Sequence, residues 1–311
     1  MQCFHKLATL TRIAALAAVL LVLDAAGLAG PVHLSRDGGN FPASVLARDR
    51  SGAPENEAAR LEQSQQALLH AEVAHIAPPS KGVTNVYAIG IAGWADQDVF
   101  IKELDGGLAV FDRILPARNH TVRLVNCRDT AKTLPLATER NFAAAVHAVA
   151  AAMDRNADVL LLLMTSHGDR RGFMLRLPNA ATSELTPQDV AATLDKEGIK
   201  YRIVIVSACF SGIFVPPLAN DNSIVLTAAD SWSTSFGCAA EREWTYFGDA
   251  FFRQSLRPGI DLMRAFDNAR ALVHGWEMMD HATPSNPQGH FGPALVEKLA
   301  PFFAAGPNAE Q

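Results

Sequence analysis

The sequence predicts an α/β fold, an open and mostly parallel sheet flanked by helices on both faces. Three observations predict it: short continuous apolar runs, amphipathic stretches between them, and helix-start signals placed after the runs. Apolar runs without alternation are typical of inner parallel strands, which are buried on both faces. Their alternation with helices favours a parallel sheet.

The predicted elements follow one another along most of the chain. The strands are expected at 86–92, 122–125, 159–165, 203–206 and 223–227. The helices are expected at 57–76, 98–115, 138–153, 187–197, 245–256 and 260–279, with a small hairpin arm at 172–177.

Two of the helix starts carry capping signals. Thr138 precedes one amphipathic stretch, and its hydroxyl suits the N-cap position. Thr186 stands directly before Pro187, with Asp189 three residues after the threonine. Proline is favoured at the first helical position, and a threonine with an acid three residues on forms a capping box.

Composition excludes several classes of protein. The 311 residues are 49% apolar and 19% charged, which requires a sizeable buried core. A formal charge of -5 offers no basic surface for nucleic acid. The four cysteines are too few for a disulfide scaffold and show no CxxC spacing, and the histidines show no metal-ligand spacing. We therefore expect no metal and no nucleic-acid partner.

The N-terminus is laid out as a signal peptide. Lys6 and Arg12 precede an apolar run at 13–23, which Asp24 ends. Crossing a bilayer takes roughly 17 or more apolar residues. We therefore expect residues 1–29 to be a cleaved leader and the protein to be periplasmic or secreted. The alternative is an anchor in the inner membrane formed by 13–23, which would be the one contact with a membrane.

The rest of the chain is expected to contain one domain. Residues 30–82 read as a linker and an accessory helix, 83–292 as the domain, and 293–311 as a C-terminal tail. Loss of the leader would leave three cysteines. Of these, Cys127 and Cys238 either pair with each other or remain separate buried thiols.

A histidine and a cysteine follow two of the predicted strands. His167 comes two residues after the strand 159–165, and Cys209 follows 203–206 closely. A right-handed crossover would lay these strands side by side, so both side chains would emerge at one edge of the sheet. A thiolate beside an imidazole is an arrangement for nucleophilic catalysis. Gly168, which lacks a Cβ, could form an oxyanion hole with the Cys209 N–H.

These motifs resemble those of the legumain-like cysteine peptidases, peptidase family C13, which share the caspase-type fold. One apolar block ends in His167-Gly168, and the other ends in Ala-Cys209-Phe-Ser-Gly212. The segments 234–238 and 245–249 are similar to legumains as well, and 284–288 is similar to bacterial members. The resemblance covers roughly 83–292 and implies a caspase-like α/β fold.

The resemblance also implies a mechanism. His167 would be the catalytic base and acid, Cys209 the nucleophile, and the Gly168 N–H part of the oxyanion hole. The family forms a thioester acyl-enzyme without metal or organic cofactor. Hydrolysis of this intermediate on a peptide or protein substrate would make a cysteine endopeptidase, and aminolysis would make a transamidase or peptide ligase. A non-catalytic caspase-like binding protein is the third alternative.

Candidate substrate-binding residues follow from the same resemblance. They are Trp94, Ser207, Thr234, Ser235, Phe236 and Glu241. Ser207 stands two residues before Cys209, where legumains and metacaspases carry an acidic residue, so the resemblance does not give the residue preferred before the cleaved bond. Glu241 lies near the position of an acidic pocket residue after a one-residue gap. Asp169 and the two arginines after it are expected in a solvated loop; the alternative is that they orient His167 or contact the substrate.

Overall fold

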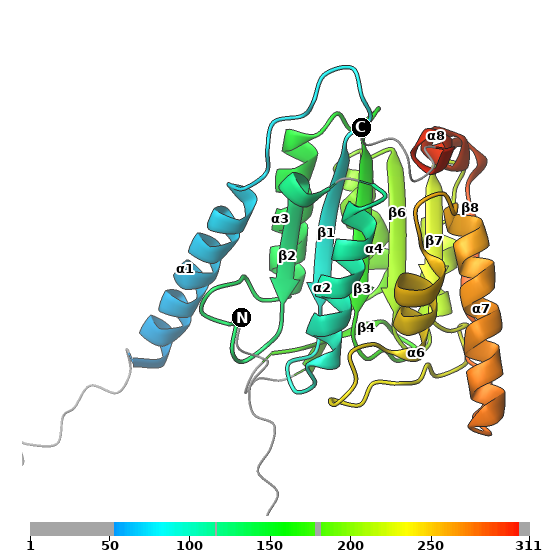
Figure 1. The fold of residues 1–311 in the computed structure, drawn as a ribbon. Helices are drawn as coiled ribbons and strands as arrows, with labels where there is room; N and C mark the ends of the chain where they lie inside the picture. The colour runs from blue at the N-terminus through cyan, green and yellow to red at the C-terminus, as the bar shows by residue number, and fades with distance from the viewer. Residues whose placement is uncertain (1–52, 116, 178–181, 305–311) are drawn as a thin grey trace, which may run out of the picture. The chain divides into compact units, whose positions relative to one another are not determined.

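The computed structural model describes residues 53–115, 117–177 and 182–304. Contacts divide the chain into two units, Met1–Arg60 and Leu61–Gln311. Within the described residues of the second unit, six strands form one sheet in the order β2-β1-β3-β6-β7-β8 (Figure 1). The pairs from β2 to β7 are parallel, and β8 pairs antiparallel with β7. The predicted open, mostly parallel sheet is confirmed.

The strands agree closely with the apolar runs of the sequence. They are β1 (Val86–Ala92), β2 (Thr121–Val125), β3 (Val159–Thr165), β6 (Tyr201–Ser207), β7 (Ser223–Thr227) and β8 (Gln288–Phe291). Every residue of β1 and β3 is buried, because helices cover both of their faces. Strand β4 (Phe173–Arg176) lies within the arm predicted at 172–177. It pairs antiparallel with β5 (Thr182–Leu185), a strand that was not predicted.

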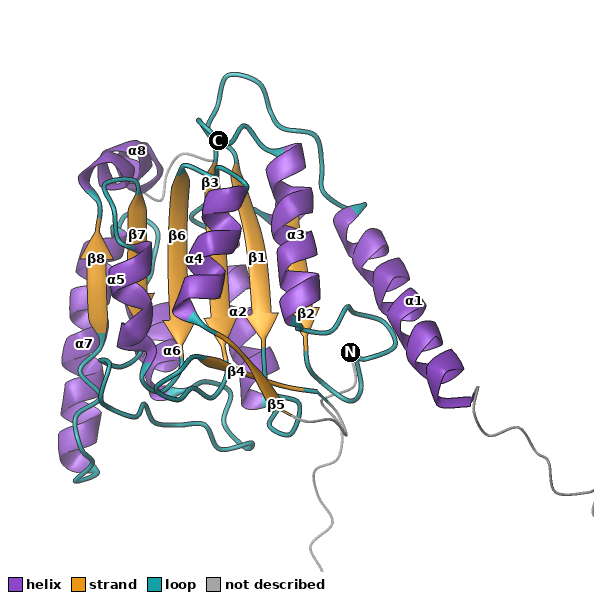
Figure 2. Cartoon of the chain, turned by 180° about the vertical axis from the view of Figure 1, so that it is seen from behind, coloured by secondary structure: helices purple, strands orange, loops and turns teal. Residues whose placement is uncertain are grey.

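Helices cover both faces of this sheet. Figure 1 shows α2 (Val99–Asp112), α6 (Tyr246–Gly248) and α7 (Leu262–Met279) in front of the strands. The reverse view in Figure 2 shows α3 (Glu139–Ala152), α4 (Pro187–Lys196) and α5 (Val215–Leu218) over the other face. The strands therefore form the middle of three layers. Short 3₁₀ helices complete the connections at Arg118–His120 (η1) and Ser211–Phe214 (η2).

Both predicted helix caps are present. The Thr138 hydroxyl accepts a hydrogen bond from the Asn141 N–H at 3.0 Å, which begins α3. The Thr186 hydroxyl accepts from the Asp189 N–H at 3.1 Å, and the Asp189 carboxylate accepts from the Thr186 N–H at 3.2 Å. These contacts satisfy N–H groups that lack a partner inside the helix.

The segment predicted as one helix at 245–256 is built differently. A short α6 leads directly into a π-helical segment, η3 (Asp249–Ser255). The Leu256 N–H donates to the Phe251 carbonyl at the end of this segment. The rings of Phe251 and Phe252 lie edge to face, 5.2 Å apart, beneath α2 and α7. The one predicted helix is therefore replaced by two short helical segments with different hydrogen-bond patterns.

The C-terminal residues 293–304 form a helix in place of the expected tail. This helix, α8 (Pro293–Ala304), buries Leu295 and Leu299 and lies beside β7. The Gly292 N–H donates to the Ser223 carbonyl at 2.8 Å, and the Ala294 N–H donates to the Asp221 carbonyl at 3.0 Å. These bonds attach α8 to the start of β7.

The accessory helix α1 (Ala53–Val73) packs on the sheet domain through its C-terminal half. Leu69 belongs to the core between the sheet and α3. The Gln65 side chain accepts from the Leu136 N–H at 2.8 Å, and Glu72 accepts from the Arg123 N–H at 3.0 Å. The predicted leader, 1–29, lies outside the described residues. In the part of the chain that the structure describes, no helix is long and apolar enough to cross a membrane.

Candidate active site

Two neighbouring strands place the predicted histidine and cysteine at one edge of the sheet. Strands β3 and β6 pair in parallel, with Thr165 opposite Ser207 at their carboxyl ends. His167 and Cys209 each follow two residues later. The expectation that these strands lie side by side is confirmed, and it follows from the crossover through α4.

Gly168 allows the backbone after β3 to lie against the backbone after β6. A Cβ at this position would lie 2.3 Å from the carbonyl oxygen of Cys209, a distance that real side chains do not tolerate. Glycine is therefore required for the backbone after His167 to approach the backbone of Cys209 this closely.

The imidazole of His167 is half-buried among two aromatic rings and an amide. The edge-to-face rings of Trp94 and Phe100 lie 4.6 Å and 5.1 Å from its centre. Its Nε2 is hydrogen-bonded to Oε1 of Gln97. Burial lowers the pKa of His167, because the charged imidazolium loses solvation there. The neutral form is thus favoured, which suits a group that accepts a proton.

Cys209 lies at the start of a sharp turn. The next residue, Phe210, has a left-handed backbone with φ 55°, which is unusual for a bulky side chain. Its N–H donates to the Ser233 carbonyl at 2.9 Å. The Ser235 N–H points at Sγ of Cys209 from 3.3 Å. The segment 233–235 therefore holds both the turn and the sulfur.

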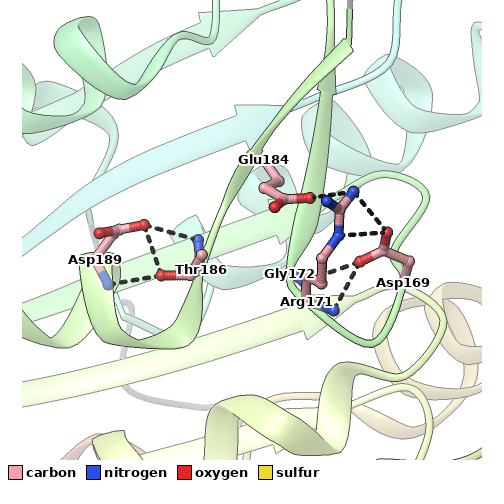
Figure 3. Close-up of polar contacts among 6 residues, drawn as sticks. All are labelled: Asp169, Arg171, Gly172, Glu184, Thr186 and Asp189. Atoms are coloured by element: carbon pink, nitrogen blue, oxygen red, sulfur yellow. Dashed lines mark hydrogen bonds and ion pairs between the residues drawn. The ribbon is translucent and has the colours of Figure 1, made fainter.

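The loop after Gly168 is braced by its own charges (Figure 3). The Asp169 carboxylate accepts from the Arg171 N–H at 2.7 Å and from the Gly172 N–H at 3.1 Å. Arg171 also forms an ion pair of 3.0 Å with Glu184 on β5. Asp169 thus shapes the loop and binds its own neighbours, as expected for a solvated loop.

An exposed cationic and aromatic rim lies next to this loop. The Arg170 guanidinium lies over the rings of Phe210, at 5.9 Å, and Trp232, at 5.4 Å. The Trp232 side chain is 73% exposed. The rim therefore exposes an indole and a guanidinium to solvent near Phe210, the residue after Cys209.

The peptidase C13 family profile matches residues 137–294, about half of the chain and including both His167 and Cys209. The chain belongs to the peptidase C13 family. No curated protein sequence matches it. Among solved structures, caspase-1 from Spodoptera frugiperda aligns with 70% of this chain and 93% of its own, at 13% identity and a TM-score of 0.48.

Membership of the C13 family supports a cysteine-peptidase type of function and a peptide or protein as substrate. Of the sequence candidates, Trp94 contacts His167, and Ser235 contacts Cys209. Phe236 is partly buried beside Tyr246, with ring centres 6.3 Å apart. Thr234, directly before Ser235, and Glu241, five residues after Phe236, are both exposed.

Ser207 of this C13 protein is buried beneath the edge that carries Cys209. Its hydroxyl lies 3.3 Å from the Thr245 hydroxyl, and it interacts with the carboxyl group of Glu103. The position that is acidic in legumains thus contacts an acidic side chain that comes from α2.

Sequence reasoning missed Glu103. Its completely buried carboxyl group accepts from the Thr165 hydroxyl at 2.9 Å and from the Thr245 N–H at 2.8 Å. A Cβ on Gly248 would lie 1.9 Å from this carboxyl, so glycine makes room for it. Burial raises the pKa of Glu103. In the helix predicted at 98–115, Glu103 stands on the apolar face next to Leu104. This unusual place for a charged residue was the feature of the sequence that could have indicated its role.

Gln97 was also missed as a partner of His167. It lies in the short segment between β1 and α2, before the residues matched by the C13 profile. Its side-chain amide also donates to the Cys238 carbonyl at 2.6 Å. Nothing in the local sequence distinguishes it from an ordinary loop glutamine.

Cys238 carries a free thiol, so it does not pair with Cys127 and the alternative of separate thiols holds. Burial raises the pKa of Cys238 to about 12. In the described ranges, no group of three or more His, Cys, Asp or Glu side chains is arranged to hold a metal ion.

Proposed function

We propose that this protein is a cysteine endopeptidase in which Cys209 is the nucleophile and His167 the base and acid. The observation that carries the proposal is the pairing of Thr165 with Ser207, because it brings the ends of β3 and β6 together. Each candidate then follows its strand by two residues. The match to the C13 family over both residues supports the same assignment.

The proposed reaction has two steps. His167 takes the proton from Sγ of Cys209, and the thiolate attacks the carbonyl carbon of the peptide bond. The tetrahedral intermediate collapses as His167 returns that proton to the leaving amine, which leaves a thioester on Cys209. His167 then takes a proton from water, the hydroxide attacks the thioester, and the acid product leaves as the proton returns to sulfur.

Two backbone N–H groups are available to stabilise the oxyanion. No hydrogen bond within the described residues uses the N–H of Gly168 or the N–H of Cys209. The close approach of Gly168 to Cys209 supports a shared role for them. Loss of one donor of this kind typically costs about 2.7–4 kcal/mol of transition-state stabilisation.

The substrate is expected to lie along segment 234–236. Ser235 contacts the sulfur through its backbone N–H, so a peptide beside this segment would pass over Cys209. Trp94 would close the site on the side of His167. Glu241 is proposed to contribute to the specificity pocket. Ser207 is buried, so it is proposed to support the pocket from beneath rather than to touch the substrate.

The test replaces each member of the pair and measures cleavage of a peptide library. Cys209→Ala and His167→Ala are expected to lower kcat/KM by at least about a thousandfold. Cys127→Ala and the exposed His147→Ala are the matched controls. The parent should also react with a thiol probe at Cys209. Cleavage unchanged in either His167→Ala or Cys209→Ala contradicts the assignment.

The same assay distinguishes hydrolysis from transfer. A nucleophilic amine added to the library would capture the thioester in a transamidase and give a ligated product. We expect hydrolysed product to dominate. A parent protein that neither cleaves nor ligates would indicate the non-catalytic binding alternative.

We also propose that the protein is exported and that residues 1–29 are removed. The proposal is supported by the basic residues and the apolar run of the N-terminus. Cell fractionation and N-terminal sequencing of the product made in a bacterial host should find it outside the inner membrane and beginning near residue 30. A product retained in the membrane with residues 13–23 intact would indicate the anchor.

A further inference from the structure

The side-chain amide of Gln97 joins the candidate histidine to the segment that holds the candidate cysteine. Its Nε2 donates to the Cys238 carbonyl at 2.6 Å, and its Oε1 is hydrogen-bonded to Nε2 of His167. Cys238 lies three residues after Ser235, and the Ser235 N–H points at the Cys209 sulfur. One amide therefore contacts both halves of the site.

The directions of these two hydrogen bonds follow from what each atom can do. A backbone carbonyl accepts only, so the amide nitrogen of Gln97 must face Cys238. The amide oxygen then faces His167, and it accepts only as well. Nε2 of His167 must therefore carry a proton, and in the neutral ring the lone pair is on Nδ1.

The surroundings keep this arrangement in place. The rings of Trp94 and Phe100 flank the imidazole edge to face and restrict its rotation. The residues on either side of Gln97 are anchored by ion pairs. Asp96 binds Arg128 at 3.2 Å and also Arg176, and Asp98 binds Lys102 at 3.3 Å. A rigid support of this kind holds a contacting side chain to one geometry.

We propose that Gln97 is a positioning residue that fixes His167 as the Nε2–H tautomer, so that Nδ1 is the atom that exchanges a proton with Cys209. This inference rests on the proposed peptidase function. The proton moves from Sγ to Nδ1, and the imidazolium keeps its Nε2–H bond to Gln97. The same proton then passes from Nδ1 to the leaving amine. Gln97 itself exchanges no proton.

Nitrogen NMR of the full-length chain tests the tautomer directly. With Cys209→Ala and ¹⁵N-labelled histidine, the His167 resonances should report a proton on Nε2. Gln97→Met has a similar length but no amide, and it should lose the preference for this tautomer. Gln97→Glu keeps an acceptor for Nε2–H and should retain it. Gln188→Met, an exposed glutamine on α4, is the matched control.

Kinetics with Cys209 intact test the consequence. Gln97→Met should lower kcat by about ten- to a hundredfold and change KM much less, since general acid–base catalysis typically contributes about 10²–10⁴-fold and depends on the orientation of the base. Gln188→Met should match the parent.

The outcomes separate this inference from the function on which it rests. An Nδ1–H tautomer in the Cys209→Ala protein, or an unchanged tautomer and kcat in Gln97→Met, overturns the role of Gln97. The first of these results does not depend on whether the Gln97 variants fold. The expected tautomer in a parent that cleaves no peptide overturns the peptidase function and leaves the tautomer assignment standing.

Discussion

At the scale of single residues, the site depends on neighbours that come from other segments. His167 follows β3, but its environment is made by Trp94, Gln97 and Phe100, which follow β1. These three residues decide how far the imidazole is buried and which of its nitrogens is occupied. The His167-Gly168 motif therefore identifies the candidate histidine, but it does not predict the burial or the hydrogen bonding of its imidazole.

The burial of His167 leads to a prediction about its titration. Trp94→Ala should raise the pKa of His167 toward the ordinary value, because removing the indole lets water solvate the imidazolium. NMR titration of the imidazole in the full-length Cys209→Ala chain measures the change. Trp232→Ala removes an indole that does not contact His167 and should leave the titration unchanged. A lower pKa in Trp94→Ala would contradict burial as the cause.

The contact of Gly168 with Cys209 leads to a second residue-scale prediction. Gly168→Ala should destabilise the fold by about 1–3 kcal/mol, because the new methyl group must displace the Cys209 carbonyl. Displacement of the reacting groups should also lower kcat/KM by about a hundredfold.

Gly275→Ala is the control for this change. Gly275 lies within α7, and nothing lies within 4 Å of the added methyl group. Alanine there should stabilise the fold by up to about 1 kcal/mol through helix propensity. Urea unfolding and peptide cleavage measure both variants. Equal stability of Gly168→Ala and the parent would show that the two backbones can separate.

At the scale of elements, strands were predicted better than the C-terminal region. Strands β1, β3 and β7 were predicted with their observed bounds, because continuous apolar runs are buried on both faces. Strand β8 was not predicted, because its residues 288–291 are mostly exposed or partly exposed and show no apolar run. Helix α8 has an apolar pattern, but it contains Pro301 and follows a turn-rich segment.

Packing of α8 predicts a measurable contribution to stability. Leu295→Ala should cost about 2–5 kcal/mol, because the side chain is completely buried beside β7. Val296→Ala, at a neighbouring position that is 38% exposed, should change stability by no more than about 0.5 kcal/mol. Urea unfolding of both variants tests this. Similar losses for the two would mean that α8 contributes no specific packing.

At the scale of the whole molecule, Glu103 links parts of the chain that are distant in sequence. From α2 it accepts hydrogen bonds from Thr165 at the end of β3 and from Thr245 at the start of α6, and it interacts with Ser207 at the end of β6. The strand ends beneath His167 and Cys209 are thereby connected through one carboxyl group.

Glu103 should influence stability in a pH-dependent way. Burial raises the pKa of Glu103 in the folded protein. Its contribution to the free energy of unfolding is therefore fully present below the ordinary pKa of a glutamate. This contribution is lost as the pH rises through the raised pKa. Glu103→Gln should remove this loss. Glu103→Leu should cost about 1–3 kcal/mol for each polar partner left unsatisfied, such as the Thr245 N–H. Urea unfolding across the pH range measures both, and an identical pH dependence of Glu103→Gln and the parent contradicts the prediction.

Part of the candidate site could be predicted from local sequence, and part of it depends on residues that are far apart in the chain. The nucleophile and base candidates were identified from the sequence, since each follows a recognisable strand and the topology rule places both at one edge. The supporting residues Gln97 and Glu103 were not identified, because their partners lie 70 and 62 residues away in the chain.

The sequence by itself determined the class of fold, the positions of the main strands along the chain, the two helix caps and the pair of residues at the sheet edge. These features depend on local patterns of apolar residues, capping groups and motifs, which a chain carries before it folds. Only the tertiary structure decided that Gln97 holds His167, that Glu103 lies beneath Ser207, and that 293–304 packs as a helix. Each of these depends on which distant atoms come within a few ångströms, and only packing determines that.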